Sequence, residues 1–189
     1  MRLAMACLMG CLYLNAPVQA AEIAGVKLAE THRTGDTMLV LNGAGVRSRF
    51  LFKVYVAALS LPVRQTQADA VLAAPPPRRM QLAMLRDVSA DAFSEALRKG
   101  LAANVNAAQL AALSPRIAEF EARIKSQGEA REGDVYVLDE TAAGMQLSVN
   151  GKPIGQPIAG PDFFRALLAV WLGDAPVQDD LKRALLGGR

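Results

Sequence analysis

The chain has 189 residues, of which 52% are hydrophobic and 21% are charged, a composition typical of one globular domain and not of a disordered or fibrous chain. Its formal net charge is only +3. Because basic and acidic residues are interspersed and form no basic stripe, the composition gives no indication of nucleic-acid binding.

The first twenty residues have the pattern of a secretory signal. Arg2 is followed by an apolar run from Leu3 to Leu14, and Val18-Gln19-Ala20 has the small-x-small pattern that precedes signal-peptidase cleavage. The run is too short for a permanent membrane span. We therefore expect residues 1–20 to be removed and one domain, residues 21–189, to be periplasmic or secreted.

Both cysteines, Cys7 and Cys11, lie in this segment, so the mature domain would have no disulfide, thiolate nucleophile or cysteine metal ligand. A minor alternative is a lipoprotein, because Leu8-Met9-Gly10-Cys11 loosely resembles a lipoprotein cleavage site that would leave Cys11 lipidated. His32 is the sole histidine, which excludes most zinc sites, and the sequence has no G-x-S-x-G elbow. We expect no metal and no cofactor.

The domain opens with predicted strands. Residues 27–33 and 38–41 flank a turn at Thr34-Gly35-Asp36. Asn42-Gly43 is a strong hairpin signal, because both residues tolerate positive φ. The sequence therefore predicts a turn here and a new strand from about Val46.

The segment 47–61 fits a period of two and not the helical period, which predicts one long strand. One face would be apolar, with Phe50, Phe52, Val54, Val56 and Ala58. The other would be mixed, with Arg47, Arg49, Leu51, Lys53, Tyr55 and Ala57. Cations in register on an apolar strand have two explanations, both open at this point. The face is solvated or belongs to an edge strand, or an arginine and a phenol hold an anion against apolar walls.

Helices and strands alternate in the rest of the chain. The expected helices are 67–73, 90–103 after a cap at Ser89 or Asp91, 107–113, a separate helix from Ser114-Pro115 to Ser126, 162–172 between Pro161 and Gly173, and 177–186. The expected strands are 79–85, 134–139, 144–149 and 154–158, with a tight turn at Asn150-Gly151. Consecutive strands would pair antiparallel with helices on one side of the sheet, which is an α+β domain.

Other polar groups are expected to be structural or exposed. His32 would be an exposed strand residue, and Arg86 would form an ion pair with Asp87 at a strand-to-helix junction. The carboxylates expected on solvated faces are Glu119, Glu121, Asp139 and Glu140. The run Gly43-x-Gly45-x-x-Ser48 is no dinucleotide loop, because it lacks a third glycine and the next segment alternates like a strand.

Several motifs in order resemble the chalcone isomerase family, especially its bacterial, exported chalcone isomerase-like members. They are LNGAGVR at 41–47, KVYVAALSL at 53–61, LRDVSA at 85–90 with the helix after it, the NGK turn at 150–152 and Gly-Pro-x-Phe-Phe at 160–164. The resemblance spans residues 22–186. It implies an open-faced β-sandwich, a large antiparallel sheet with helices layered on one face and a ligand cleft between them. The family includes plant enzymes that close chalcones to flavanones, plastid proteins that bind fatty acids, and non-catalytic or uncharacterised relatives.

The resemblance implies site residues as well. In the enzymes the arginine after the GAGV motif, here Arg47, polarises the substrate, a task suited to a permanent cation in a dry cleft. In the fatty-acid binders an arginine and a tyrosine hold the carboxylate. Arg47 and Tyr55 are the counterparts here, and Arg49 is the alternative to Arg47.

The departures from the plant enzyme make the cleft more apolar. Its active-site tyrosine aligns with Phe93, its helical asparagine with Gly100 and its late-helix threonine at or near Phe163, and Tyr55 replaces a threonine on the arginine strand. Phe93 and Phe163 would line the cleft or be plain core residues. An apolar slot with one cation suits an acyl chain with a carboxylate head better than a polyphenol.

The resemblance therefore predicts an exported, non-catalytic binder of a fatty acid or similar amphipathic carboxylate, and it names no protein partner. The alternative is an isomerase or intramolecular lyase that acts on a chalcone-like unsaturated carbonyl compound through Arg47. Whether this chain is an enzyme is left open by the residues.

Overall fold

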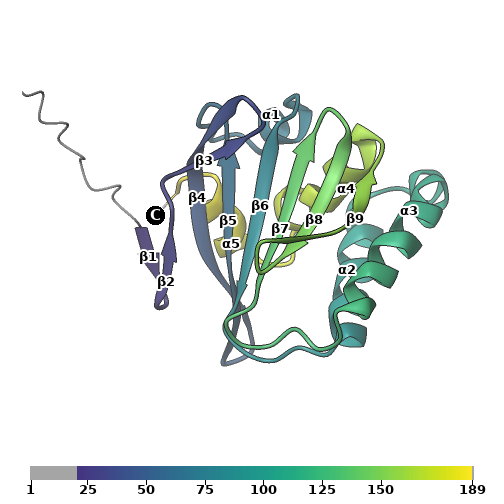
Figure 1. Ribbon diagram of the computed structural model, residues 1–189, viewed down its shortest axis with the longest axis horizontal. Coiled ribbons are helices and arrows are strands. Elements are labelled where there is room, and N and C mark those ends of the chain that lie inside the picture. Colours follow the sequence, from purple (N-terminus) through teal and green to yellow (C-terminus); the bar gives the residue numbers. More distant parts are fainter. Residues whose placement is uncertain (1–20, 189) are drawn as a thin grey trace, which may run out of the picture.

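A computed structural model describes residues 21–188 of the protein (Figure 1), and the predicted secretory segment with both cysteines lies outside this range. One antiparallel sheet has its strands in chain order from β3 to β9. These strands are β3 (Thr31–Thr34), β4 (Thr37–Arg49), β5 (Phe52–Leu61), β6 (Arg78–Met84), β7 (Val135–Thr141), β8 (Gly144–Val149) and β9 (Lys152–Ile158). A separate two-stranded ribbon consists of β1 (Ala21–Ile23) and β2 (Val26–Leu28).

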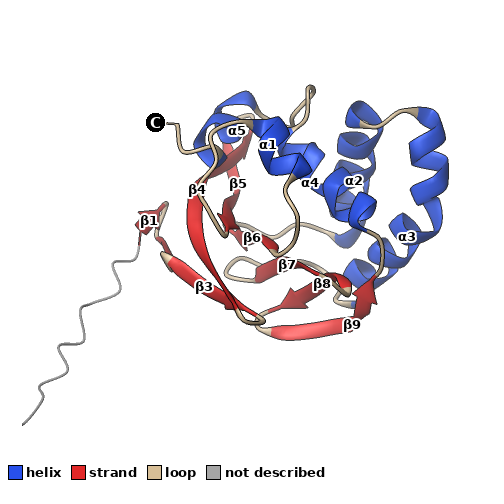
Figure 2. Ribbon diagram, turned by 90° about the horizontal axis from the view of Figure 1, so that it is seen from above, coloured by secondary structure: helices blue, strands red, loops and turns tan. Residues whose placement is uncertain are grey.

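The helices cover one face of this sheet, which curls around them like half a barrel (Figure 2). They are α1 (Ala68–Ala73), α2 (Ala90–Asn104), α3 (Ala107–Ser126), α4 (Pro161–Leu172) and α5 (Asp179–Leu185). Helix α4 is the central one, since all its residues after Asp162 except Arg165 are buried. The predicted α+β class, with an antiparallel sheet and helices on one side, is confirmed.

The two faces of β5 serve two different cores. Ala57, Leu59 and Leu61 belong to the main core under the helices, whereas Val56 and Ala58 face the other way, toward the small cluster that includes β1 and β2. This alternation is the period of two that the sequence predicted for the second half of the segment.

The predicted hairpin turn at Asn42-Gly43 is wrong, because both residues lie inside the continuous strand β4, next to a register shift between Leu41 and Gly43. Helix α5 packs directly over this point. A Cβ on Gly43 would lie 2.1 Å from the carbonyl oxygen of Ala184. Asn42 ties the same helix to the strand, since its Nδ2 donates to the Leu185 carbonyl at 2.7 Å. The Asn-Gly pair therefore docks the C-terminal helix and makes no turn.

The turn lies instead at Phe50-Leu51, between Arg49 and its partner Phe52. A bulge follows, since Ser48 pairs with Lys53 but Arg47 pairs with Tyr55. Val54 is the extra residue, so the strict alternation predicted for 47–61 is broken twice near its start.

Helix α3 also differs from the prediction. It runs through Pro115 without interruption, whereas the sequence predicted a new helix at Ser114-Pro115. A proline inside a helix removes one hydrogen bond and costs about 3 kcal/mol. Burial of one face of the helix against the core offsets this cost, through Leu113, Ile117, Phe120 and Ile124.

The single strand predicted at 27–33 is wrong, because this segment is divided between β2 and β3 of different sheets. Three other local signals are confirmed. The Ser89 side chain caps α2 by accepting from the Ala92 amide, and α4 begins at Pro161 and ends before Gly173. Asn150 and Gly151 both have positive φ in the turn between β8 and β9, as a type I′ turn requires.

Candidate ligand cavity

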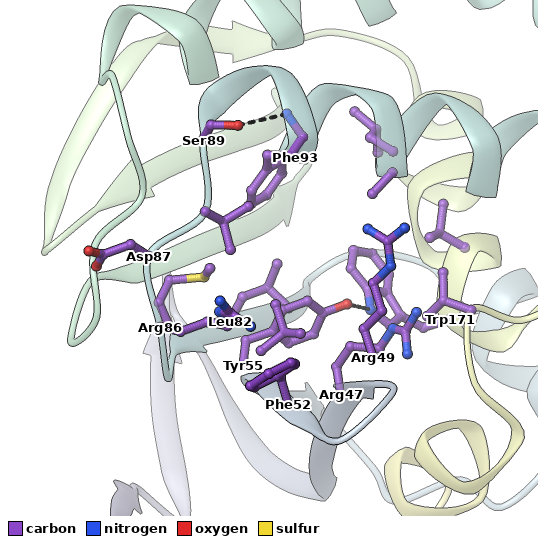
Figure 3. Close-up of a pocket in the computed structure, with 18 of the residues that line it drawn as sticks. Arg47, Arg49, Phe52, Tyr55, Leu82, Arg86, Asp87, Ser89, Phe93 and Trp171 are labelled. Carbon is purple, nitrogen blue, oxygen red and sulfur yellow. Dashed lines mark hydrogen bonds between the residues drawn. The ribbon is translucent and has the colours of Figure 1, made fainter.

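A cavity of about 480 Å³ lies between the sheet and the helices at one end of the helix-covered face (Figure 3). Its walls come from the β4–β5 hairpin, the end of β6, the loop 86–89, the first turns of α2 and the C-terminal half of α4. The volume is within the range of roughly 300–1,000 Å³ found for small-molecule sites. The chain therefore has room for a ligand between its two layers.

Arg47 and Tyr55 line this cavity and are direct cross-strand partners on β4 and β5, so their side chains leave the sheet as neighbours. Arg47 Nη1 donates to the Ser48 carbonyl and, at 3.2 Å, to Gln178 Oε1. Gln178 Oε1 also accepts from the Ser48 amide at 2.9 Å. The residue before α5 thus holds the end of β4 and orients Arg47.

Tyr55 is a hydrogen-bond donor without a partner among the described residues. Trp171 Nε1 donates to the Tyr55 hydroxyl oxygen at 3.0 Å, which leaves the Tyr55 O–H free to donate toward the cavity. Burial raises the pKa of Tyr55 above its ordinary value of 10.0, against the hydrogen bond from Trp171 and the charge of Arg47, which lower it. The hydroxyl therefore keeps its proton at neutral pH.

Arg49 and Arg86 also line the cavity, and Figure 3 draws them with Arg47 around the Tyr55 ring. The Arg49 guanidinium lies 5.8 Å from the ring centroid of Phe50, and that of Arg86 lies 4.8 Å from the ring centroid of Phe52. Within residues 21–188 none of the three arginines forms an ion pair.

The predicted ion pair between Arg86 and Asp87 is wrong. The Asp87 carboxylate turns to the loop before β7, where Oδ1 accepts from the Glu132 amide at 2.8 Å. Arg86 is left exposed at the cavity. Asp87 is the single acidic residue among the described residues that line the cavity, so positive charge dominates there.

Apart from Ser89, apolar side chains form the rest of the wall. Phe93 lines the cavity from α2, with its ring centroid 5.6 Å from that of Tyr136. Phe163 does not: it is fully buried in the core and stacks edge-on against Phe120 at 6.1 Å. Gly100 lies where α2 crosses α4, and a Cβ there would be 2.6 Å from Val170 Cγ1.

The structure thus brings Arg47, Arg49, Tyr55 and Phe93 together and leaves Phe163 out. Arg86 and Trp171 also line the cavity, although the sequence predicted neither as a site residue. A usable signal for Trp171 was its place as the sole tryptophan on the most apolar helix. No comparable signal existed for Arg86.

Several other ionisable groups outside the cavity have partners within the protein. Of the four carboxylates predicted on solvated faces, only Glu119 is exposed. Glu140 and Glu121 are buried and pair with Arg78 and Arg98, and Asp139 is half-buried and pairs with Arg79. His32 is half-buried, and burial followed by the charge of Arg79 lowers its pKa. In the part of the chain that the structure describes, no group of three or more His, Cys, Asp or Glu residues is placed to hold a metal ion.

A curled antiparallel sheet, with helices on one face and a cavity between the layers, defines an open-faced α+β sandwich. Residues 20–187 match the family described as chalcone isomerase-like, and the chain belongs to this family. The predicted family and fold are therefore confirmed.

The crystal structure of a fatty-acid binding protein from Arabidopsis thaliana has a similar fold, with a TM-score of 0.70 and 14% sequence identity. The match covers 89% of this chain and 96% of the Arabidopsis chain. A search of curated proteins gave no match. Among residues 21–188, no helix has both the length and the apolar character needed to cross a membrane.

Proposed function

We propose that the protein binds a fatty acid or a similar amphipathic carboxylate in this cavity, with the head group between Arg47, Arg49 and Tyr55. One observation carries the proposal. Three arginines without carboxylate partners in the described chain stand beside a tyrosine with a free O–H, in a cavity whose other lining residues are apolar except for Asp87 and Ser89.

The head group of the ligand would accept hydrogen bonds from donors that have no partner among the described residues. Within residues 21–188, only Nη1 of Arg47 makes hydrogen bonds, which leaves Nε and Nη2 for a ligand. A guanidinium fork matches a carboxylate with two parallel bonds, and charge-assisted bonds are about twice as strong as neutral ones. The Tyr55 hydroxyl, protonated at neutral pH, supplies a further donor.

The acyl chain would lie against the apolar wall, which includes Leu82, Met84, Leu97 and Val170. Each buried methylene contributes about 0.8 kcal/mol, so about ten methylenes contribute about 8 kcal/mol. Micromolar affinity corresponds to about −8.2 kcal/mol. The head group then offsets the entropy lost on association. The Arabidopsis protein of the same fold is named as a fatty-acid binder, which supports the proposal.

We further propose that binding takes place in the periplasm or outside the cell, after removal of residues 1–20. N-terminal sequencing of the protein recovered from a secreting host tests this step. A mature chain that begins at Ala21 is expected, whereas a lipid on Cys11 or an intact Met1 contradicts it.

Titration with laurate and palmitate, followed by calorimetry, tests the ligand. Wild-type protein should bind with micromolar affinity. Tyr55→Phe and Arg49→Met should each weaken binding about tenfold or more, because a bond to a charged group is lost. Arg33→Met is the matched control, since Arg33 is an exposed arginine on β3, outside the cavity. Absence of binding by the wild type, or equal affinity in all four proteins, rejects the proposal.

An isomerase acting on an unsaturated carbonyl compound is the second candidate, because Arg47 and Tyr55 also form a pair of donors suited to a carbonyl oxygen. The phenyl ring of Phe93 supplies no further donor opposite them. Turnover of a chalcone that Arg47→Met abolishes and Arg33→Met preserves would establish catalysis. Without such turnover the binding function stands alone.

A further inference from the structure

The tip of the β4–β5 hairpin carries three consecutive apolar residues that the fold leaves in solvent. The exposed fraction is 89% for Phe50, 97% for Leu51 and 60% for Phe52. Single exposed apolar residues are common, but a run of three or more on a surface marks a function or an aggregation hazard. The hairpin reaches the lower edge of the sheet in Figure 1, where the described residues leave it uncovered.

The backbone of this turn does not favour the residue that occupies it. Phe50 has a φ of 54°, whereas Leu51 is not among the residues with positive φ. This is the pattern of a type II′ turn, whose first central position favours glycine. A bulky residue in this conformation is strained. Since Phe50 is almost fully exposed, packing within the described fold does not explain its presence.

Positive charge surrounds the tip. Arg49 precedes it and Lys53 follows it, and both side chains are exposed. Arg86 lies against Phe52 from the next strand end. Two acidic groups lie nearby: Glu95 on α2 pairs with Lys99 at 2.6 Å, which together with the smaller effect of the Arg49 charge lowers its pKa, and Asp87 accepts from the Glu132 amide. The apolar tip therefore projects from a cationic collar.

We propose that this hairpin docks the protein on an anionic lipid bilayer. Phe50 and Leu51 insert at the boundary between head groups and acyl chains, and Arg49 and Lys53 contact lipid phosphates. Apolar residues flanked by Lys and Arg are the general pattern of interfacial membrane binding. A stable protein interface needs about 800 Å² and 20–30 residues on each side, which a projecting tip of three apolar residues does not supply.

Docking would also set the position of the cavity. Phe50 and Phe52 belong to both the exposed tip and the cavity wall. With the tip inserted, the mouth of the cavity faces the membrane, so an amphipathic ligand would pass between lipid and protein without crossing water. Membrane docking stands whether or not the cavity ligand is a fatty acid.

Co-sedimentation with vesicles tests the proposal. The full chain is mixed with vesicles of phosphatidylcholine or of equimolar phosphatidylcholine and phosphatidylglycerol, and every variant keeps residues 1–20, so any affinity of that segment is common to all. Wild type should prefer the anionic vesicles. Phe50→Asn/Leu51→Ser should weaken binding by at least about tenfold, and asparagine tolerates the positive φ at this turn. Arg49→Gln and Lys53→Gln should each weaken binding to anionic vesicles about fivefold.

Val63→Ser is the matched control, because Val63 is 68% exposed and lies beyond the opposite end of β5. It should bind like the wild type. An unchanged affinity of Phe50→Asn/Leu51→Ser, or an equal loss in Val63→Ser, overturns the proposal.

A local probe removes any contribution of the N-terminal segment. In Leu51→Trp, the added indole should shift its emission to the blue on anionic vesicles and be quenched by lipids brominated on the acyl chain. Trp171, which is buried, gives the background in the wild type. Emission that vesicles leave unchanged overturns the docking proposal, and the laurate and palmitate titrations in solution decide the ligand proposal separately.

Discussion

At one end of the helix-covered face of the sheet Arg78 is fully buried, whereas at the other end Arg47, Arg49 and Arg86 surround a cavity. The Arg78 guanidinium donates to both oxygens of Glu140, at 2.6 and 2.9 Å, and to the carbonyls of Val71 and Leu72.

The closed end of this face, at Arg78, and its open end, at the cavity, are opposite ends of the same strands. Arg78 pairs with Glu140 across β6 and β7, while Tyr55 at the other end pairs with Arg47 and with Met84. Where this fold buries a cation completely, it supplies an anion from its own chain. At the other end Arg49 and Arg86 are exposed and Arg47 is half-buried, and none of the three forms an ion pair with a described residue, so their charge is left to water or to a ligand.

The largest effect is expected at the closed end. Arg78→Met leaves the Glu140 carboxylate buried without its counter-ion, and removal of one partner from a buried pair costs about 3–5 kcal/mol. Urea unfolding measures the loss. The double variant Arg78→Met/Glu140→Leu should recover much of it, since no charge is then left buried. Wild-type stability of Arg78→Met would mean that the fold tolerates the buried Glu140 carboxylate without its counter-ion.

A smaller loss, about 1–3 kcal/mol, is expected from overpacking in Gly43→Ala. The new Cβ meets the backbone of Ala184, which cannot yield without moving α5. Gly45→Ala is the matched variant, because its Cβ meets side-chain atoms, Ala184 Cβ at 2.8 Å and Leu181 Cδ1 at 3.0 Å. Thermal unfolding should show that Ala184→Gly partly rescues Gly45→Ala and leaves Gly43→Ala unimproved. Rescue of both variants would mean that Gly43→Ala also clashes with the side chain of Ala184 and not with its backbone.

Alkaline pH should lower the stability through ionisation of the Tyr55 hydroxyl at the open end. Burial raises the pKa of Tyr55 above 10.0 in the folded protein. Its contribution to stability is therefore complete below pH 10.0, the unfolded value, and is lost as the pH rises through the folded pKa. Burial raises the pKa of Tyr136 as well, so Tyr55→Phe should reduce the decline without abolishing it. Urea unfolding from pH 8 to 11 checks this sign, and a decline of unchanged size in Tyr55→Phe would count against it.

The smallest effect on stability is expected from the cavity arginines themselves. Arg49 is exposed and forms no ion pair with a described residue, so Arg49→Met should change the free energy of unfolding by no more than about 0.5 kcal/mol. Saturating palmitate should nevertheless stabilise the wild type more than this variant. Differential scanning calorimetry with and without palmitate gives both numbers. A large loss of stability in Arg49→Met without palmitate would mean that Arg49, like Arg78, has a structural role.

Local sequence signals were reliable where adjacent residues alone determine the backbone conformation. The Asn150-Gly151 turn, the Ser89 cap and the Pro161 helix start depend on the conformation of a few adjacent residues, and all three are confirmed. Order and spacing of the motifs identified the family and so the layered α+β fold. Of the four candidate residues on β4, β5 and α2, all line the cavity.

The signals that failed have partners far away in the chain. Asn42-Gly43 is a local hairpin signal, but α5 packs on it from more than 140 residues later, as the bond from Asn42 to Leu185 shows. Glu140 was predicted to be a surface carboxylate, but the pairing of β6 with β7 places it beside Arg78. Pro115 stays within a helix because the core buries the helix face around it.

The sequence by itself determined the family, the class of fold and the cationic and phenolic residues of β4 and β5. Only the tertiary structure decided which cations were neutralised within the chain, that Arg86 and Trp171 join the cavity, and that Phe163 does not. The reason is physical: propensity and periodicity report interactions between near neighbours, whereas burial and charge pairing depend on segments that meet only after the sheet has curled around its helices.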